Sequence, residues 1–250
     1  MILFYFSGTG NSKYISERFG KKMKVDCYSI EEQLDFKTLI EGNKIIGFCY
    51  PVYCSRVPRI MREFVASIYS QLKGKKIVIF CTQLIFSGDG ARAFTDLFEP
   101  NYIKVIYAEH FNMPNNICNV PIIPITNDKR NRKYLAKAEH KLNNVCRNMR
   151  VGITKKRGFS KGSKVLGLVQ GIFSPTFEKG VLHSVQVDEE CTGCGLCVSI
   201  CPMNNLELVV HQIKQNGKCI ACYRCVNQCP SKAITVAFNN KVKKQYKGII

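Results

Sequence analysis

Short hydrophobic runs alternate with amphipathic stretches through the first 150 residues of the chain. Apolar runs of strand length occupy residues 2–6, 25–29, 44–50, 76–81 and 103–108. Such continuous runs are typical of strands that are buried on both faces. The stretches between them place apolar residues at helical spacing, as on the face formed by Ile60, Met61, Phe64, Val65 and Ile68. This alternation predicts an α/β fold in which helices cover both faces of a five-stranded parallel sheet.

The pattern changes after the longest predicted helix. Residues 128–150 carry one apolar stripe, made of Leu135, Ala138, Leu142, Val145 and Met149. Residues 151–186 contain six glycines, show little periodicity and begin with basic residues. We interpret them as a linker with a partly ordered apolar middle at 165–173, between a domain at 1–150 and a cysteine-rich domain at 187–240, and we expect the basic tail at 241–250 to be loose.

Composition narrows the class of protein. Apolar residues make up 46% of the 250 residues, which is ordinary for a globular chain. No apolar run is long enough to span a bilayer, and no basic stretch precedes the apolar run at 2–6 as it would in a signal peptide. Of the 14 cysteines, six are scattered singly (Cys27, Cys49, Cys54, Cys81, Cys118 and Cys146). This distribution favours a reducing, cytoplasmic location.

The other eight cysteines form one spacing pattern that occurs twice. Cysteines separated by two, two and three residues are followed by proline in both copies, at Cys191, Cys194, Cys197, Cys201 and Pro202 and at Cys219, Cys222, Cys225, Cys229 and Pro230. Thiolates at these offsets are the ligands of four-iron four-sulfur clusters in bacterial ferredoxins. A pair of zinc sites is the alternative for any isolated Cys-x2-Cys, but it does not account for eight cysteines in this order. The pattern therefore predicts two 4Fe-4S clusters.

A glycine-rich turn directly follows the first predicted strand. It consists of Ser7, Gly8, Thr9, Gly10, Asn11 and Ser12 and leads into a helix. Backbone N–H groups and hydroxyls at such a helix start can bind a phosphate. The turn has no lysine after its second glycine and lacks the G-x-G-x-x-G pattern, so neither a nucleoside triphosphate loop nor a dinucleotide site is indicated.

Two further loops follow the third and fourth strands. Ligands of open α/β sheets bind at the carboxyl ends of the strands, so we expect both loops to contact a flat cofactor ring. Aromatic side chains could flank this ring, and Tyr53 and Phe86 are the candidates, although either could merely close the end of the sheet. The predicted contact residues are Pro51, Val52, Tyr53 and Cys54 in the first loop and Thr82, Gln83, Phe86, Ser87, Gly88, Asp89 and Gly90 in the second.

The turn at 7–12, placed at the head of an α/β pattern, resembles the FMN phosphate loop of flavodoxins. The whole chain resembles the flavodoxin–ferredoxin fusion proteins of anaerobic bacteria and archaea. This resemblance implies a flavodoxin-like fold that binds FMN, followed by a small α+β two-cluster domain. It also implies that the fourth ligand of each cluster comes from the other copy. One cluster would use Cys191, Cys194, Cys197 and Cys229, and the other would use Cys219, Cys222, Cys225 and Cys201.

The formal net charge is +19. Two oxidised clusters and one flavin phosphate would each contribute about −2, which leaves about +13. Residues 129–164 hold thirteen Lys or Arg and one acid, Glu139. They form either a solvated helix face or a docking surface for an acidic redox partner. No nucleic-acid-binding motif accompanies the charge, so we expect no nucleic-acid partner.

These features leave two hypotheses for the function. The chain could be an electron-transfer protein that relays electrons between the clusters and FMN and couples one-electron to two-electron steps. Alternatively, it could be an FMN-dependent reductase that the clusters supply with electrons and that acts on a small electrophile such as a quinone or nitroaromatic. A sensory protein would need a partner-recognition element, which we do not find. A homodimer that brings one chain's clusters to the other chain's FMN is compatible with either hypothesis.

Overall fold

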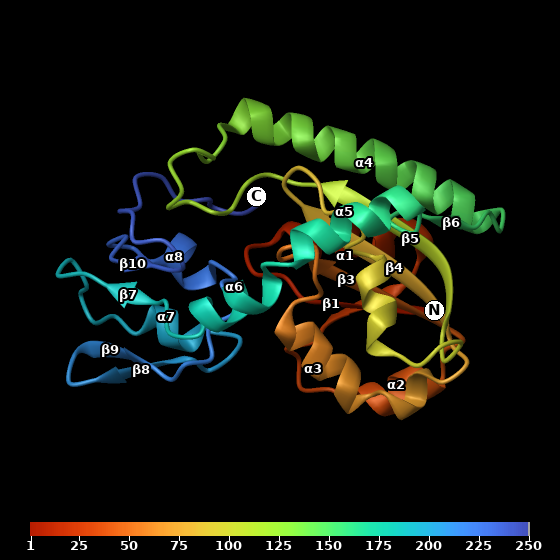
Figure 1. Ribbon diagram of the computed structural model, residues 1–250, viewed down its shortest axis with the longest axis horizontal. Coiled ribbons are helices and arrows are strands. Elements are labelled where there is room, and N and C mark those ends of the chain that lie inside the picture. Colours follow the sequence, from red (N-terminus) through yellow and green to blue (C-terminus); the bar gives the residue numbers. More distant parts are fainter. Residues whose placement is uncertain (250) are drawn as a thin grey trace. The chain divides into compact units, whose positions relative to one another are not determined.

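A computed structural model describes residues 1–249, and these divide into two compact units. The first unit comprises residues 1–7, 11–113 and 131–174. The second comprises residues 8–10, 114–130 and 175–249. We describe each unit by itself, and both appear in Figure 1.

The first unit is built around a six-stranded sheet in the order β2-β1-β3-β4-β5-β6, with every pairing parallel. Strands β1, β3, β4 and β5 match predicted apolar runs closely because they are largely buried, whereas β2 is half-buried. The register aligns Ile2, Ile46 and Ile77 on adjacent strands. The bounds are β1 (Ile2–Tyr5), β2 (Asp26–Ser29), β3 (Ile45–Pro51), β4 (Lys76–Gln83), β5 (Lys104–Asn112) and β6 (Lys155–Lys156).

Helices cover both faces of this sheet, as the alternating pattern predicted. Phe4 contacts Phe36 and Phe64 on one face, whereas Phe80 contacts Phe19 and Phe111 on the other. The helical elements of the first unit and its margins are α1 (Asn11–Met23), α2 (Phe36–Glu41), α3 (Arg59–Ser67), η1 (Ser70–Leu72), η2 (Arg92–Leu97), α4 (Asp128–Arg150) and α5 (Lys161–Gly171). The α/β class is therefore confirmed, with a sixth short strand at the edge beside β5.

Segment 151–186, which we expected to be a linker, holds three ordered elements. They are β6, α5 and α6 (Ser174–Val181). The hydrophobic pattern could not predict strand β6, because this strand consists of two exposed lysines that pair with Tyr107 and Ala108 of β5. Helix α5 begins at Ser160, whose side chain accepts a hydrogen bond from the Ser163 backbone N–H at 3.1 Å.

The second unit is small and carries two antiparallel ribbons. Its elements are β7 (Gln186–Val187), α7 (Leu196–Ser199), β8 (Leu206–Val209), β9 (Gln212–Gln215), α8 (Arg224–Gln228) and β10 (Ile234–Thr235). Strand β7 pairs with β10, and β8 pairs with β9. This arrangement fits the predicted small α+β domain.

The tail after residue 240, which we expected to be loose, packs into the second unit. Val242 and Tyr246 are 2% and 3% exposed. The Gln245 side-chain amide donates to the carbonyl oxygens of Val226 at 3.0 Å and Cys229 at 2.6 Å. Val242, Gln245 and Tyr246 thus anchor the tail to the second unit. The lysines around them had led us to expect a solvated end.

Candidate functional site

The two cysteine copies have the same backbone conformation in the structure. Each copy places residues in the left-handed region two, four and thirteen positions after its first cysteine. These residues are Gly193, Gly195 and Asn204 in the first copy and Ala221, Tyr223 and Lys232 in the second. Left-handed residues let the chain turn sharply within each run of closely spaced cysteines. The repeated spacing therefore corresponds to a repeated loop geometry.

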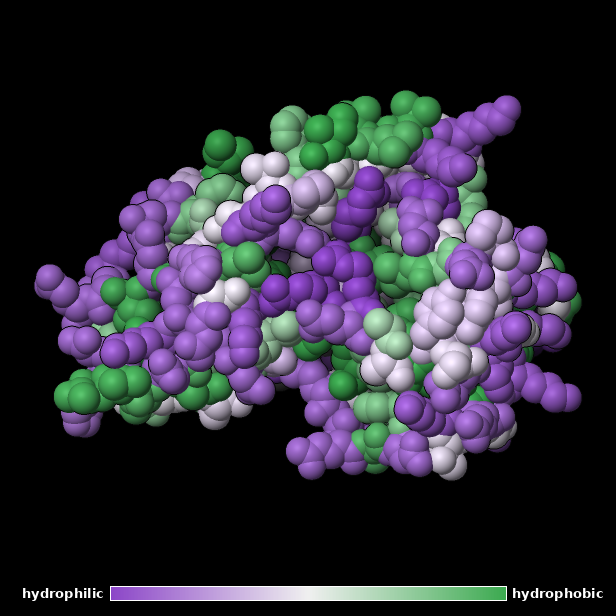
Figure 2. All heavy atoms as spheres, turned by 60° about the horizontal axis from the view of Figure 1, so that its bottom comes forward, coloured by the Kyte–Doolittle hydropathy of each residue, from purple (hydrophilic) through white to green (hydrophobic). Residues whose placement is uncertain are grey.

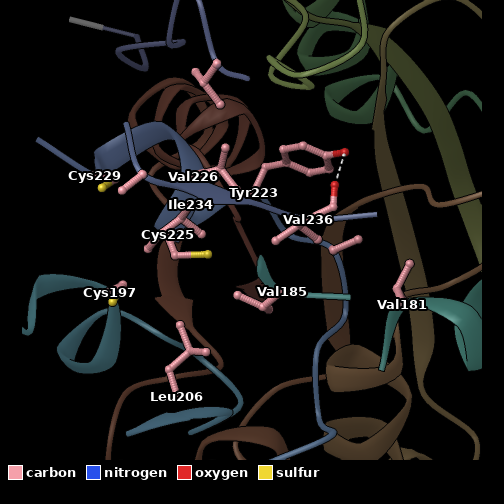
Figure 3. Close-up of a cluster of buried hydrophobic side chains, with 13 residues drawn as sticks. Val181, Val185, Cys197, Leu206, Tyr223, Cys225, Val226, Cys229, Ile234 and Val236 are labelled. Atoms are coloured by element: carbon pink, nitrogen blue, oxygen red, sulfur yellow. Dashed lines mark hydrogen bonds between the residues drawn. The ribbon is translucent and has the colours of Figure 1, made fainter. Parts of the chain in front are cut away.

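The cysteines gather in two groups that mix the two copies. Cys201, Cys219, Cys222 and Cys225 line one hollow, whose walls also include Leu206 and Val236. Cys197 has Cys191, Cys194 and Cys229 as its interacting thiol neighbours. Figure 3 shows Cys197, Cys225 and Cys229 at the margin of a buried apolar cluster that also contains Val226 and Ile234. In each group, three cysteines come from one copy and one cysteine comes from the other.

The surroundings of these thiols fit an iron–sulfur cluster. Burial, followed by the neighbouring thiolates, raises the pKa of Cys197 to about 11. Burial also raises the pKa of Cys222 to about 12. Thiolates held close together repel one another, so a bound positive centre is needed to stabilise four of them in one group. Backbone N–H groups of Asn205 and Ala221 already donate to the sulfurs of Cys201 at 3.3 Å and Cys219 at 3.4 Å. Hydrogen bonds of this kind tune cluster potentials.

No group of three or more His, Cys, Asp or Glu side chains in residues 1–249 converges as the ligands of a single metal ion would. Tyr223 fixes the second cysteine loop from the opposite side, because its hydroxyl donates to the carbonyl oxygen of Val236 at 3.1 Å (Figure 3).

The predicted phosphate turn is divided between the two units. Gly8, Thr9 and Gly10 belong to the second unit, and Ser7, Asn11 and Ser12 belong to the first. Gly10 has φ of 99°, a conformation that favours glycine. Within the second unit, the backbone of Gly8 lies so close to the Cys222 carbonyl that any Cβ there would overlap it. The Arg224 guanidinium donates to the carbonyl oxygens of Gly8 at 3.2 Å and Ile200 at 3.0 Å.

The predicted residues at the sheet end of the first unit form a buried polar cluster. The hydroxyls of Ser12 and Thr82 lie 2.8 Å apart and are hydrogen-bonded to each other. The Gln83 side-chain oxygen at the end of β4 is buried, and it has no hydrogen-bond partner among residues 1–249. A buried acceptor without a donor is costly, so this position fits a ligand that supplies a donor.

The loop after β3 is a tight turn. Tyr53 and Arg56 exchange backbone hydrogen bonds of 3.2 and 2.9 Å across Cys54 and Ser55. Cys54 has φ of 48° and Ser55 has φ of 58°, which is the geometry of a type I′ turn. Glycine or asparagine usually occupies such a turn, so this loop holds a strained backbone without glycine. Pro51, Val52 and Tyr53 are each partly exposed.

The loop after β4 has an exposed half and a buried half. Phe86 is 47% exposed and fits a residue that flanks a ring, whereas Ser87 and Asp89 are almost fully buried. Asp89 receives hydrogen bonds from Arg92 at 2.6 Å and lies 3.7 Å from the guanidinium of Arg56. The side chains of Ser87 and Asp89 thus contact protein. In the buried half of the loop, the Gly90 backbone N–H donates a hydrogen bond to the Ser87 carbonyl oxygen at 2.8 Å.

Helix α5 contacts both of these loops, and sequence analysis did not reveal this. Its Gly167 packs directly on Asp89, and its Gly171 packs directly on Arg56. Its Gln170 accepts a hydrogen bond of 2.5 Å from the Ser55 hydroxyl. The spacing of the two glycines was the only available signal, and it does not say which surface the helix meets.

Part of the basic segment surrounds a buried carboxylate. Glu109 of β5 is 1% exposed and lies 2.9 Å from Lys155, 3.6 Å from Arg157 and 3.7 Å from Lys141. Together with His140, these residues line a hollow of about 480 Å³ beside α4. Three cations around one carboxylate leave this surface positive.

The parallel order with β1 at the point where the strand order reverses defines a doubly wound, flavodoxin-like class of fold. Residues 2–120 match the family model of the flavodoxin domain, and residues 190–234 match that of the 4Fe-4S dicluster domain. The chain therefore carries a flavodoxin domain followed by a 4Fe-4S dicluster domain, as its sequence predicted. The presence of these two domains supports the conclusion that the chain is an electron-transfer protein that uses FMN and iron–sulfur clusters.

Solved structures similar to this chain include several flavodoxins. A flavodoxin from the domain Archaea has 13% identity and a TM-score of 0.41, and the match covers 60% of this chain and 97% of that one. The two-electron reduced flavodoxin of Megasphaera elsdenii has 21% identity and a TM-score of 0.41, with 56% and 99% covered. General stress protein 14 of Treponema denticola, solved in complex with FMN, has 14% identity and a TM-score of 0.35, with 56% and 97% covered. No curated protein matches the sequence.

No helix within residues 1–249 is both long and apolar enough to cross a bilayer.

Proposed function

We propose that this chain passes electrons between two 4Fe-4S clusters and one FMN, and exchanges them with acidic redox partners. The observation that carries the proposal is the grouping of eight cysteines into two sets, each of which combines both copies. These cysteines follow a flavodoxin domain in the sequence. The clusters supply single electrons, and the flavin accepts one or two, which couples the two kinds of redox step.

In this proposal, each ligand set takes three cysteines from one copy and one from the other. Cys191, Cys194, Cys197 and Cys229 hold one cluster, and Cys219, Cys222, Cys225 and Cys201 hold the second. The apolar wall formed by Leu206, Val226 and Val236 limits access of water to the second set. Restricted solvent access is one of the factors that set the cluster potential.

FMN is proposed to bind at the carboxyl ends of the strands. Its phosphate would be bound by the turn at 7–12, through backbone N–H groups and hydroxyls at the start of α1. Its ring would lie by Tyr53 and Phe86, and Gln83 would provide a hydrogen-bond acceptor. The unsatisfied Gln83 oxygen supports this placement. The buried hydroxyls of Ser12 and Thr82 bond each other and would support the site from behind.

An acidic partner is proposed because the first unit presents a positive surface around Lys155 and Arg157. The side chains of Lys155 and Arg157 are about half exposed. Exposed cations of this kind raise the rate of encounter with an acidic protein, and salt screens the effect.

The proposal can be tested with anaerobically reconstituted protein. Iron, sulfide and FMN are quantified first. Dithionite is then added in stepwise amounts, and flavin and cluster absorbance are followed after rapid mixing. We expect two clusters and one FMN per chain, and electrons that equilibrate between them faster than an added acceptor removes them. Clusters that do not exchange electrons with the flavin on that timescale would refute the internal relay.

A reductase acting on a small electrophile is the second candidate, and a hollow in the first unit favours it. This hollow of about 350 Å³ lies at the ends of β4 and β5 and is lined by Leu84, Ile85, Phe111, Asn112, Tyr134, Lys137, Ala138 and Lys141. Its aromatic and cationic walls suit a flat acceptor such as a quinone. Saturable turnover of a quinone by the reduced protein, weakened in a Tyr134→Ala variant, would support this candidate. Turnover that is linear in quinone concentration and unchanged in the variant would favour the relay.

A further inference from the structure

Helix α5 has its apolar side on the outside. The residues that face the protein are Gly167 and Gly171, with the amide of Gln170 beside them. The opposite side is aliphatic and exposed, with Val165 62%, Leu166 39%, Leu168 58% and Val169 54% exposed, followed by Ile172 at 66% and Phe173 at 70%. A helix of a monomeric soluble protein normally shows the reverse arrangement.

The exposed side chains form one continuous patch. In Figure 2, apolar side chains gather along α5 at the upper edge of the view. Contiguous apolar surface of this kind marks an interaction site.

The chain around this patch is cationic. Between residues 151 and 177 there are five Lys or Arg and no acid, and they precede the apolar stretch (Lys155, Lys156, Arg157, Lys161 and Lys164). Lysines at the border of an apolar face can extend their ammonium groups to lipid phosphates while their stems lie along the apolar surface. An anionic lipid surface can bury the aliphatic patch and at the same time attract the cations with its negative headgroups.

We propose that α5 is a peripheral membrane-docking helix that binds the surface of an anionic bilayer through its outward apolar side. The helix lies in the plane of the interface, with Leu168, Val169, Ile172 and Phe173 inserted among the acyl chains to a depth of about 5–10 Å. Lys161 and Lys164 contact the headgroups. This binding does not depend on the proposed electron-transfer function.

Two observations favour lipid over a second copy of the chain or a protein partner. The glycine pair Gly167 and Gly171, which lets two helices approach closely in dimers, is already occupied by Asp89 and Arg56 of the same unit. The patch also consists of aliphatic residues and phenylalanine. It lacks the Trp, Tyr and Arg residues that dominate the binding energy of protein interfaces.

The experiment is vesicle flotation of the reconstituted full chain. Vesicles of phosphatidylcholine alone are compared with vesicles that also contain phosphatidylglycerol, at low and at physiological salt. We expect binding to the anionic vesicles that survives physiological salt. In the double variant Leu168→Gln and Val169→Gln, we expect binding at least about tenfold weaker, because two apolar side chains no longer enter the bilayer. Lys161→Gln with Lys164→Gln should lower binding to anionic vesicles and make the residual binding less sensitive to salt.

A matched control removes two exposed aliphatic side chains elsewhere. Ile122 is 91% exposed and Val210 is 88% exposed. The Ile122→Gln and Val210→Gln variant should bind vesicles as the wild type does. Glutamine is a good helix former, and unchanged FMN and iron contents confirm that each variant is folded.

Three results would overturn the proposal. One is no binding to either vesicle. Another is binding that physiological salt abolishes and that the Leu168 and Val169 variant leaves unchanged, because it would be charge attraction alone. The third is self-association of the wild type, lost in that variant and without vesicle binding, which would make the patch an interface between copies.

Discussion

Gly167 of α5 lies directly against the carboxylate of Asp89, and no side chain fits between them. Asp89 is fully buried in the loop after β4, where FMN is proposed to bind. This one contact attaches a helix from the expected linker to the central loop of the proposed flavin site. The position of α5 therefore depends on the absence of a Cβ at residue 167.

Gly167→Ala is expected to destabilise the first unit by about 1–3 kcal/mol. The added methyl group overlaps the Asp89 side chain and the buried loop cannot yield without losing its ion pairs. Chemical unfolding monitored by circular dichroism provides the measurement. The control is Gly162→Ala in the same helix, where a Cβ meets nothing within 4 Å. That variant should be unchanged or more stable by about 0.5 kcal/mol, because alanine is the better helix former. Equal losses in both variants would contradict the packing argument.

Asp89→Asn is expected to cost about 3 kcal/mol of unfolding free energy. The variant removes the buried negative charge that pairs with the partly buried guanidinium groups of Arg56 and Arg92. Asp96→Asn is the matched control, because Asp96 binds the same Arg92 at 2.7 Å but its side chain is 55% exposed. Water screens the second pair, so its loss should cost less than about 1 kcal/mol. Thermal and urea unfolding measure the loss of unfolding free energy in the two variants. A larger loss for Asp89→Asn than for Asp96→Asn shows that the buried ion pairs contribute more than the exposed one.

His110 is expected to make stability depend on pH between about 4 and 6.5. Burial, followed by the positive charge of Arg157, lowers the pKa of His110 to about 4, with Lys141 acting in the same direction and Glu109 opposing it. The neutral ring accepts a hydrogen bond from the Ala91 backbone N–H at 3.2 Å. The unfolded chain binds a proton near pH 6.5 and the folded chain does not. The stability contributed by neutral His110 is therefore complete above pH 6.5 and is lost as the pH falls toward 4, by up to about 3 kcal/mol.

Urea unfolding across this pH range measures the effect of His110. A His110→Gln variant has no imidazole and should lose this part of the pH dependence, while keeping the part that carboxylates cause. If the slopes of wild type and variant coincide between pH 4 and 6.5, the imidazole does not titrate as the structure implies.

The crossed ligand sets can be tested with two double variants that contain the same number of substitutions. Cys197→Ser with Cys229→Ser removes two ligands from one set, so one cluster should remain. Cys197→Ser with Cys201→Ser removes one ligand from each set, so both clusters should be lost or altered. Iron and sulfide analysis with electron paramagnetic resonance of the reduced protein distinguishes the outcomes. Ligand sets confined to one copy would give the opposite pattern.

The strands and the 4Fe-4S dicluster domain were predictable because each depends on a strong local pattern. Residues 44–50 form a continuous apolar run, and β3 follows it almost residue for residue. The cysteine spacing is a covalent constraint that needs no tertiary information. In contrast, Lys155 and Lys156 form a strand only because the edge of β5 is available to pair with them.

The contacts of α5 and of the tail could not be predicted for the same reason. Gly167, Gly171 and Gln170 acquire their roles from a surface distant in sequence. Tyr246 and Val242 look like isolated apolar residues in a basic tail, and their burial depends on the second unit. For α5, the amphipathic pattern would also predict the wrong side to be buried, because its apolar side faces outward.

The left-handed positions shared by the two cysteine copies are occupied by different residue types. Gly193 and Gly195 adopt this conformation without steric cost, whereas Ala221 and Tyr223 adopt it at a cost of about 1 kcal/mol each. The second copy therefore depends more than the first on its neighbours to hold the shape of its loop.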